Sequence, residues 1–143
     1  MTSQISTRVV HAGEERRKPY GALTTPIVQT STYTFEDTAE IMSFMRQKAT
    51  GVMSSRVDYG RYGNPTQSAV EGKLAALEGA EEALLFASGM SAITTTLGAL
   101  LYSGDHLILV REAYHRTREL AEVYLSRWGI DTTFASIDDP QAL

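Results

Sequence analysis

From residue 65 onward, apolar side chains follow two alternating patterns, one with helical spacing and one of short continuous runs. Val70, Leu74 and Leu77 recur at helical intervals, which predicts an amphipathic helix. Continuous apolar runs predict short buried strands. The predicted elements, in chain order, are helix 65–78, strand 83–87, helix 90–101, strand 106–110, helix 114–128 and strand 130–135. This alternation indicates the α/β class, with a mostly parallel sheet and right-handed crossovers.

The first 64 residues have a different pattern, rich in Thr, Ser, Arg and Tyr, with only short apolar stretches. We expect one helix there, over 36–48, because the segment that begins at Thr34 has capping-box spacing and apolar residues follow at helical intervals. The sequence therefore predicts two parts, an N-terminal arm over 1–64 and an α/β region over 65–143.

The composition narrows the class of function. The chain has 143 residues, no cysteine, and 17 acidic against 13 basic side chains, a net charge of -4. This excludes a disulfide scaffold and disfavours nucleic acid as a partner. The apolar runs are far shorter than the roughly 20 residues of a membrane span, and no leader is evident, so we expect no membrane partner and a cytoplasmic protein. His11, His106 and His115 lack metal-ligand spacing, and we expect no metal.

Two candidate ligand-binding segments follow predicted strands. Ligands of parallel sheets bind beyond the carboxyl ends of the strands, where helices begin. Ser88, Gly89 and Met90 lie between the strand 83–87 and its helix, and backbone N–H groups at a helix start favour an anion. Tyr114 follows the next strand and adds an aromatic ring. Together they suggest a flat, phosphorylated cofactor, although each segment is also typical of an ordinary turn or a packing tyrosine.

A third candidate is the segment 59–65, in which Arg61 is flanked by glycines. Its guanidinium can bind a phosphate with two parallel hydrogen bonds, and Tyr59 adds a phenolic hydroxyl. The alternatives are a solvated turn, or a segment that stacks on single-stranded nucleic acid. The acidic net charge argues against the second alternative.

Five segments, in this order, resemble the Cys/Met metabolism family of pyridoxal phosphate (PLP) enzymes. They are residues 7–13, 26–33, 59–66, 77–80 and 87–93. The resemblance covers essentially the whole chain. It implies a type I PLP-dependent, aspartate aminotransferase-like fold, in which 65–143 is the first, truncated part of the PLP-binding large domain. The arm over 1–64 is then part of the subunit interface.

The same resemblance implies roles for individual residues. Ser88, Gly89 and Met90 cradle the phosphate of PLP, and Tyr114 stacks on its pyridine ring. Tyr59 and Arg61 reach the phosphate bound by the neighbouring subunit. Tyr59, through its hydroxyl, and Tyr114 are the two predicted catalytic residues. The implied assembly is a dimer of dimers with active sites shared between subunits, acting on small amino-acid substrates.

The stretch 114–117, together with 58–63, is more similar to plant-type and related bacterial cystathionine γ-synthases than to methionine γ-lyases. The resemblance therefore implies a γ-replacement in which cysteine displaces the activated group of a homoserine derivative and forms cystathionine, a step of trans-sulfuration and methionine biosynthesis. The alternative reaction is the γ-elimination of cystathionine or methionine γ-lyases.

The Schiff-base lysine of the family lies in a part of those longer proteins that has no counterpart here. The three lysines of this chain are Lys18, Lys48 and Lys73, and none is placed to replace it. We therefore expect an N-terminal fragment of an enzyme, unable by itself to bind PLP covalently. The alternative from another class is a non-catalytic interaction fragment that pairs with a full-length homologue.

Overall fold

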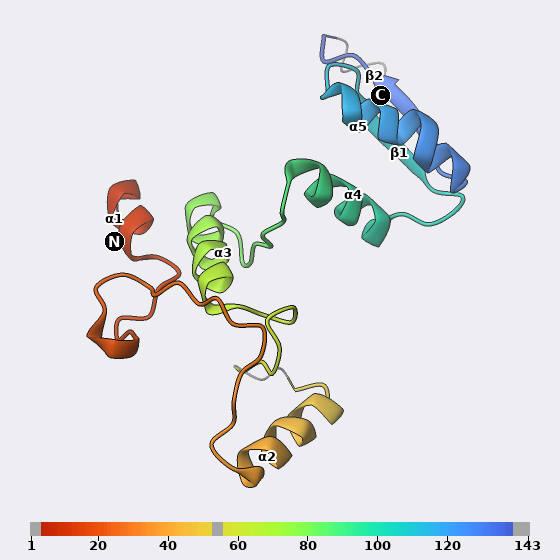
Figure 1. Ribbon diagram of the computed structural model, residues 1–143. Helices are drawn as coiled ribbons and strands as arrows, with labels where there is room; N and C mark the ends of the chain where they lie inside the picture. The colour runs from red at the N-terminus through yellow and green to blue at the C-terminus, as the bar shows by residue number, and fades with distance from the viewer. Residues whose placement is uncertain (1–3, 53–55, 139–143) are drawn as a thin grey trace. The chain divides into compact units, whose positions relative to one another are not determined.

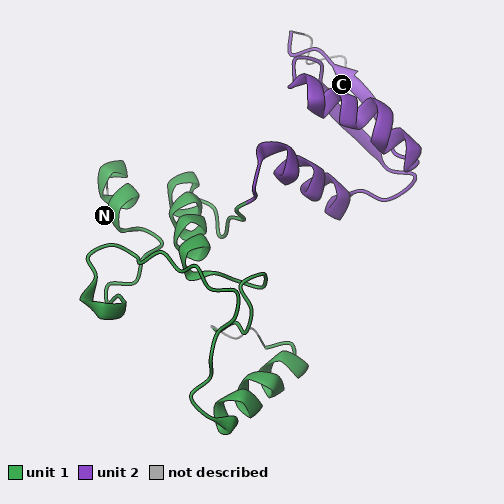
Figure 2. Ribbon diagram, viewed as in Figure 1, with its two compact units in different colours: residues 1–85 green, residues 86–143 purple. Residues whose placement is uncertain are grey.

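The computed structural model describes residues 4–52 and 56–138 of the 143-residue chain. These residues form two compact units, one over residues 1–85 and one over residues 86–143, which Figure 2 shows in different colours. Each unit is built in a different way, so each is described by itself. The predicted functional division, with an arm that ends at residue 64, remains a prediction.

The second unit contains a parallel pair of strands, β1 (His106–Val110) and β2 (Asp131–Ala135). They pair in register from His106 opposite Asp131 to Val110 opposite Ala135. The N–H of Arg111 donates to the carbonyl of Ala135 at 2.7 Å and extends the ladder by one bond. The predicted strands 106–110 and 130–135 and the parallel α/β arrangement are therefore confirmed.

The crossover between the strands is one continuous helical segment that lies against the sheet (Figure 1). It begins as α5 (His115–Glu119) and continues as a π-helical stretch, η2 (Leu120–Leu125). The sequence predicts a uniform helix over 114–128 and gives no sign of the π-helical stretch. A π-helix is bonded from i to i+5, and the leucines at the two ends of this stretch, Leu120 and Leu125, are both buried in the core.

The core of the second unit is a cluster of buried apolar residues between the sheet and two helices. Helix α4 (Gly89–Leu100) and both strands pack around the crossover, and the predicted helix 90–101 is found one residue earlier. The buried members of the cluster are Leu120, Ala121, Leu125 and Ile130, and the partly buried ones are Met90, Ile93, Leu97, Leu101, Leu107, Leu109 and Phe134. This core fixes the loops at the carboxyl edge of the strands.

The predicted strand 83–87 is not found as a strand: these residues pair with no strand in the part of the chain that the structure describes. Side chains of a helix bind the backbone of Leu85 instead. The carboxylate of Glu71 accepts from the N–H of Leu85 at 2.8 Å, and the amide of Gln67 donates to its carbonyl at 3.4 Å. The prediction of a strand here is wrong, because pairing needs a neighbouring strand that a local apolar pattern cannot supply.

The first unit is a set of short helices joined by long connections. They are α1 (Ile5–His11), the 3-10 turn η1 (Pro19–Gly21), α2 (Thr38–Ala49) and α3 (Pro65–Glu78). The sequence predicts α3 with its Asn64 cap and its Gly79 terminator, and both are present, with Gly79 at φ 71°. It does not predict α1, and it places the start of α2 at the wrong capping signal. Asp37, not Thr34, caps α2 by accepting from the N–H of Glu40 at 2.8 Å.

Helix α3 packs against the segment that contains α1, and two glycines permit this approach. Gly13 has φ 71°, and a Cβ atom at this position would lie 2.6 Å from the carbonyl oxygen of Ala69. A Cβ on Gly72 would lie 2.7 Å from the Cα of Gly13. Any side chain at either position would push the two segments apart. Backbone contact of this kind replaces a hydrophobic core in this part of the unit.

Candidate functional site

The first candidate segment lies at the start of α4. Ser88 caps this helix: its Oγ accepts from the N–H of Ser91 at 3.1 Å and its carbonyl accepts from the N–H of Ala92 at 3.0 Å. An α-helix leaves its first backbone N–H groups outside its own ladder. The cap serves one of them, which leaves the N–H groups of Gly89 and Met90 for a ligand.

Gly89 leaves open space at this helix start. A Cβ atom built there would have no atom within 4 Å, so a ligand can approach the backbone closely. Free N–H groups, a positive helix end and space beside them are the requirements of a phosphate. The residues present therefore fit a phosphate such as that of PLP, and their contact with it stays a prediction.

Tyr114 lies at the start of the other helix of this unit. It is the N-terminal boundary residue of α5, its side chain is largely exposed, and its ring contacts that of His115 edge-on, with centroids 4.6 Å apart. The hydroxyl of Thr117, one turn along, donates to the sulfur of Met90 at 3.7 Å. The first turns of α4 and α5 are therefore in contact, which brings the predicted phosphate and ring contacts to the same end of the unit.

Thr117 is a residue that the sequence-based prediction missed. It is buried, with 7% of its surface exposed, and its hydroxyl joins the two helix starts that carry the candidate residues. A small polar residue three positions after an aromatic one is common on ordinary helices, so the sequence alone offered no signal for this contact.

Arginines surround the carboxyl end of β1. The guanidinium of Arg111 donates to the carbonyl of Phe134 at 3.4 Å, and that of Arg118 donates to the carbonyl of Arg111 at 3.1 Å. Arg116 forms an ion pair with Glu119 at 2.7 Å, and this carboxylate raises the pKa of Arg116 above its ordinary value. Cations at this edge favour an anionic ligand.

A short antiparallel contact holds the segment that carries the other two predicted site residues. Tyr59 forms a β-bridge with Thr32, and the N–H of Gly60 donates to the carbonyl of Ser31 at 2.8 Å. A Cβ on Gly60 would lie 3.0 Å from the carbonyl oxygen of Thr30. The glycine after Tyr59 is therefore needed for close approach to the chain beside it, in addition to any role in bending.

Arg61 lies between two tyrosine rings. Its guanidinium carbon is 4.9 Å from the ring centroid of Tyr59 and 5.8 Å from that of Tyr62. The two rings meet edge-on at 6.2 Å, and the N–H of Tyr62 donates to the carbonyl of Tyr59 at 2.9 Å, which closes a turn. Stacking on both rings restricts the guanidinium, while the residue remains exposed and accessible to a ligand.

The three lysines of the chain all contact carboxylates. Lys18 and Lys73 approach the carboxylate of Glu14 at 3.0 and 2.5 Å, and Lys48 lies 3.7 Å from that of Asp58. Hydrogen bonds from Lys73 and then Lys18 lower the pKa of Glu14 to about 2. None of these ammonium groups lies in the unit that contains Ser88 and Tyr114, and the location of the Schiff-base lysine in another part of the protein stays a prediction.

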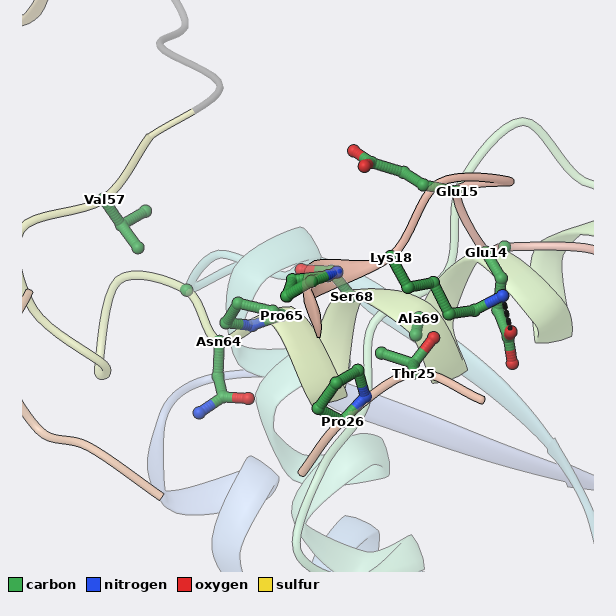
Figure 3. Close-up of a pocket in the computed structure, with 13 residues that line it drawn as sticks. Glu14, Glu15, Lys18, Thr25, Pro26, Val57, Asn64, Pro65, Ser68 and Ala69 are labelled. Carbon is green, nitrogen blue, oxygen red and sulfur yellow. Dashed lines mark ion pairs between the residues drawn. The ribbon is translucent and has the colours of Figure 1, made fainter. Parts of the chain in front are cut away.

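The lysine-carboxylate cluster borders a pocket of about 380 Å³ in the first unit (Figure 3). The pocket lies between the arm and the start of α3, where Lys18 reaches Glu14 and Asn64 points away towards the carbonyl of Val28. None of the six predicted site residues lines it. Lys18 is paired with Glu14, and the amide of Asn64 bonds to the backbone of Val28 and Thr66, so we assign the pocket no ligand.

The structure places the six predicted site residues in two groups. Ser88, Gly89, Met90 and Tyr114 belong to the second unit, whereas Tyr59 and Arg61 belong to the first. Within the residues that the structure describes, no group of histidines or carboxylates has the geometry of a metal site, and no helix is long and apolar enough to cross a membrane.

Comparison with known proteins identifies the relatives of the chain. Residues 6–143 match the family described as Cys/Met metabolism PLP-dependent enzyme. The chain is 44% identical to cystathionine gamma-synthase 1, chloroplastic, of Arabidopsis thaliana, over 92% of this chain and 23% of that protein. It is 36% identical to the L-methionine gamma-lyase of Treponema denticola, over 96% of this chain and 33% of that protein. The crystal structure of metB from Corynebacterium glutamicum superimposes with a TM-score of 0.79 at 33% identity, covering 94% of this chain and 32% of that one.

Proposed function

The chain belongs to the Cys/Met metabolism PLP-dependent enzymes, and from this premise we propose that the complete protein is a cystathionine γ-synthase. It would use PLP to replace the activated group on the γ carbon of a homoserine derivative with the sulfur of cysteine. The chain spans about a quarter to a third of the relatives compared above, so the activity is proposed for the complete protein.

The observation that carries this proposal is the higher identity of the chain to the plant γ-synthase than to the methionine γ-lyase compared above. The match to the plant γ-synthase is 44%, against 36% to the methionine γ-lyase, over nearly the same part of the chain. This part includes the 58–63 and 114–117 segments, which contain Tyr59, Arg61 and Tyr114.

The second unit would hold the cofactor. The N–H groups of Gly89 and Met90 would bind the phosphate, with Ser88 fixing the helix start, and the ring of Tyr114 would lie against the pyridine. Thr117 would keep these two contacts at a fixed spacing, because its hydroxyl reaches Met90. Water is excluded from one side of such a ring by the side chain stacked on it.

The arm of a neighbouring subunit would complete the site. Arg61 would add a charge-assisted contact to the phosphate, and Tyr59 would hold or move a proton at its phenolic oxygen. A helix end contributes only ~0.3 to 2 kcal/mol, against about 8 kcal/mol for micromolar binding, so a cationic partner is required. The assembly that we propose for the complete protein is a dimer, paired into a tetramer, as the family resemblance implies.

PLP would supply the stabilisation of negative charge on the substrate carbons that lets a group leave from the γ position. This chain would supply binding, orientation and proton transfer. The described residues therefore account for the phosphate end and the ring face of the site, and the proposal leaves the covalent attachment to the rest of the protein.

The test is an assay of the complete, PLP-loaded protein with an activated homoserine, with and without cysteine. We expect cystathionine to form faster with cysteine than keto acid and ammonia form without it. The result that overturns the proposal is release of keto acid at an equal or higher rate, with no cystathionine.

A γ-elimination is the second candidate, and the identity to a methionine γ-lyase supports it. The two reactions share the cofactor and the early steps, and they differ in whether a thiol or water completes the reaction. Methionine supplied as the only substrate separates them, since a γ-lyase releases keto acid from it and a γ-synthase does so slowly.

A further inference from the structure

Lys48 lies in the last turn of α2, and its ammonium meets three groups at once. Its Nζ is 3.7 Å from a carboxylate oxygen of Asp58, 5.1 Å from the ring centroid of Tyr62 and 5.6 Å from that of Phe44. The first two belong to the segment around Tyr59 and Arg61, and the third, which is buried, belongs to α2 itself. This one side chain therefore joins the helix to that segment.

The segment is held from its other side by backbone bonds. The carbonyl of Asp58 accepts from the N–H of Tyr33 at 3.1 Å, beside the bridge between Tyr59 and Thr32. These bonds fix the backbone but leave the exposed ring of Tyr62 to be placed by side-chain contacts. Lys48 and Arg61 are both within cation–π distance of this ring. Lys48 therefore contacts the same ring that Arg61 stacks against.

The N-terminal end of α2 is tied to the same part of the chain. The guanidinium of Arg56 bonds to the carboxylate of Glu40 and to the carbonyl of Thr34, and its carbon lies 4.6 Å from the ring centroid of Phe35. Helix α2 is therefore anchored near both of its ends to the residues that precede and include the Tyr59 turn. The helix therefore supports this turn.

We propose that Lys48 is a positioning residue for Arg61, which orders the Tyr62 ring and thereby the guanidinium for its anionic ligand. This inference rests on the proposed function, in which that ligand is the phosphate of PLP. A long guanidinium side chain loses rotamer freedom when it binds, and a side chain already ordered loses less. Lys48 would therefore raise phosphate affinity without touching the phosphate.

The test compares binding of PLP and of pyridoxal, which lacks the phosphate, to the complete apoprotein. The variant Lys48→Met keeps most of the length of the side chain and removes the charge. We expect it to weaken PLP binding about fivefold, the scale of one exposed ion pair and one cation–π contact, and to leave pyridoxal binding unchanged. Lys48→Arg keeps the positive charge and should bind PLP as tightly as the unchanged protein does. Arg46→Met removes a charge from the same helix and serves as the matched control.

A second variant separates positioning from folding. Asp58→Asn removes the ion pair from the other side, so it should weaken PLP binding by a similar factor, and the double variant should lose little more than either single one. Circular dichroism checks that α2 is retained. If Lys48→Met unfolds α2, the positioning role is decided from the PLP affinities of two other variants, Asp58→Asn and Lys48→Arg.

Arg61→Ala distinguishes failure of this inference from failure of the proposed function. Weakened PLP binding in Arg61→Ala with none in Lys48→Met or Asp58→Asn overturns the role of Lys48 alone. Unchanged binding in Arg61→Ala overturns the phosphate contact and the positioning role together. An equal loss of PLP and pyridoxal in Lys48→Met also overturns the positioning role, because it shows a general structural defect.

Discussion

The two units of the chain differ in what holds them together. In the second unit, buried apolar side chains from two helices and two strands form one cluster, and a backbone ladder joins the strands. In the first unit, Phe44 and Ala75 are the buried apolar residues that the structure describes, and it relies on glycine contacts, capping bonds and ion pairs. The pattern of apolar residues along the sequence predicts an apolar core well, and it predicts a unit held by glycine contacts, caps and ion pairs poorly.

The largest effect is expected in the core of the second unit. Leu125 is 1% exposed, so Leu125→Ala should lower the free energy of unfolding by about 3 kcal/mol, through lost burial and the cavity left behind. Urea unfolding of the complete protein measures it. Val123→Ala, a partly exposed position in the same helical stretch, is the control and should cost clearly less. Equal costs would show that the cluster is not the stabilising element.

The second prediction probes the glycine contact of the first unit. Gly13→Ala puts a Cβ against the backbone of α3 at a positive φ angle, so it should cost about 2 kcal/mol. The loss should be local, with faster hydrogen exchange in α1 and at the facing turn of α3. Gly98→Ala in α4 is the control, because nothing lies within 4 Å of its Cβ and alanine is the better helix former. Unchanged exchange in α1 would contradict the contact.

The smallest effect concerns the ion pairs of Glu14. Because its pKa is lowered from 4.5 to about 2 in the folded chain, its stabilising contribution is complete above about pH 4.5 and is lost as the pH falls towards 2. Glu14→Gln should therefore reduce stability at neutral pH and have no effect near pH 2. Thermal unfolding over this range measures the difference, with Glu15→Gln as the charge control. A difference that persists at pH 2 would show that the ion pairs are not its cause.

Predictions from local pattern succeeded where a single element decides the outcome. The helix predicted over 90–101, the helix between Asn64 and Gly79 and the strand 106–110 each depend on residues close together in sequence. The family and its cofactor followed from five short segments in order, and the comparisons confirm both.

Long-range contacts account for the failures. In the segment 83–87, which is not a strand, side chains of α3 bind the backbone of Leu85, and α1 has no strong helical pattern of its own but packs through Gly13. The contact between Thr117 and Met90 joins residues of two different helices. None of these depends on spacing along the chain, so no local pattern could have indicated them.

The contact between Gly13 and Gly72 also restricts how this protein can change by mutation. Each glycine occupies the room that a side chain on the other would need, so neither position can compensate for a larger residue at its partner. Substitutions at the two positions are therefore coupled, because the close contact excludes a side chain at either one. Once one of the two glycines is replaced by a larger residue, keeping the other gives no benefit unless α1 packs in a different position.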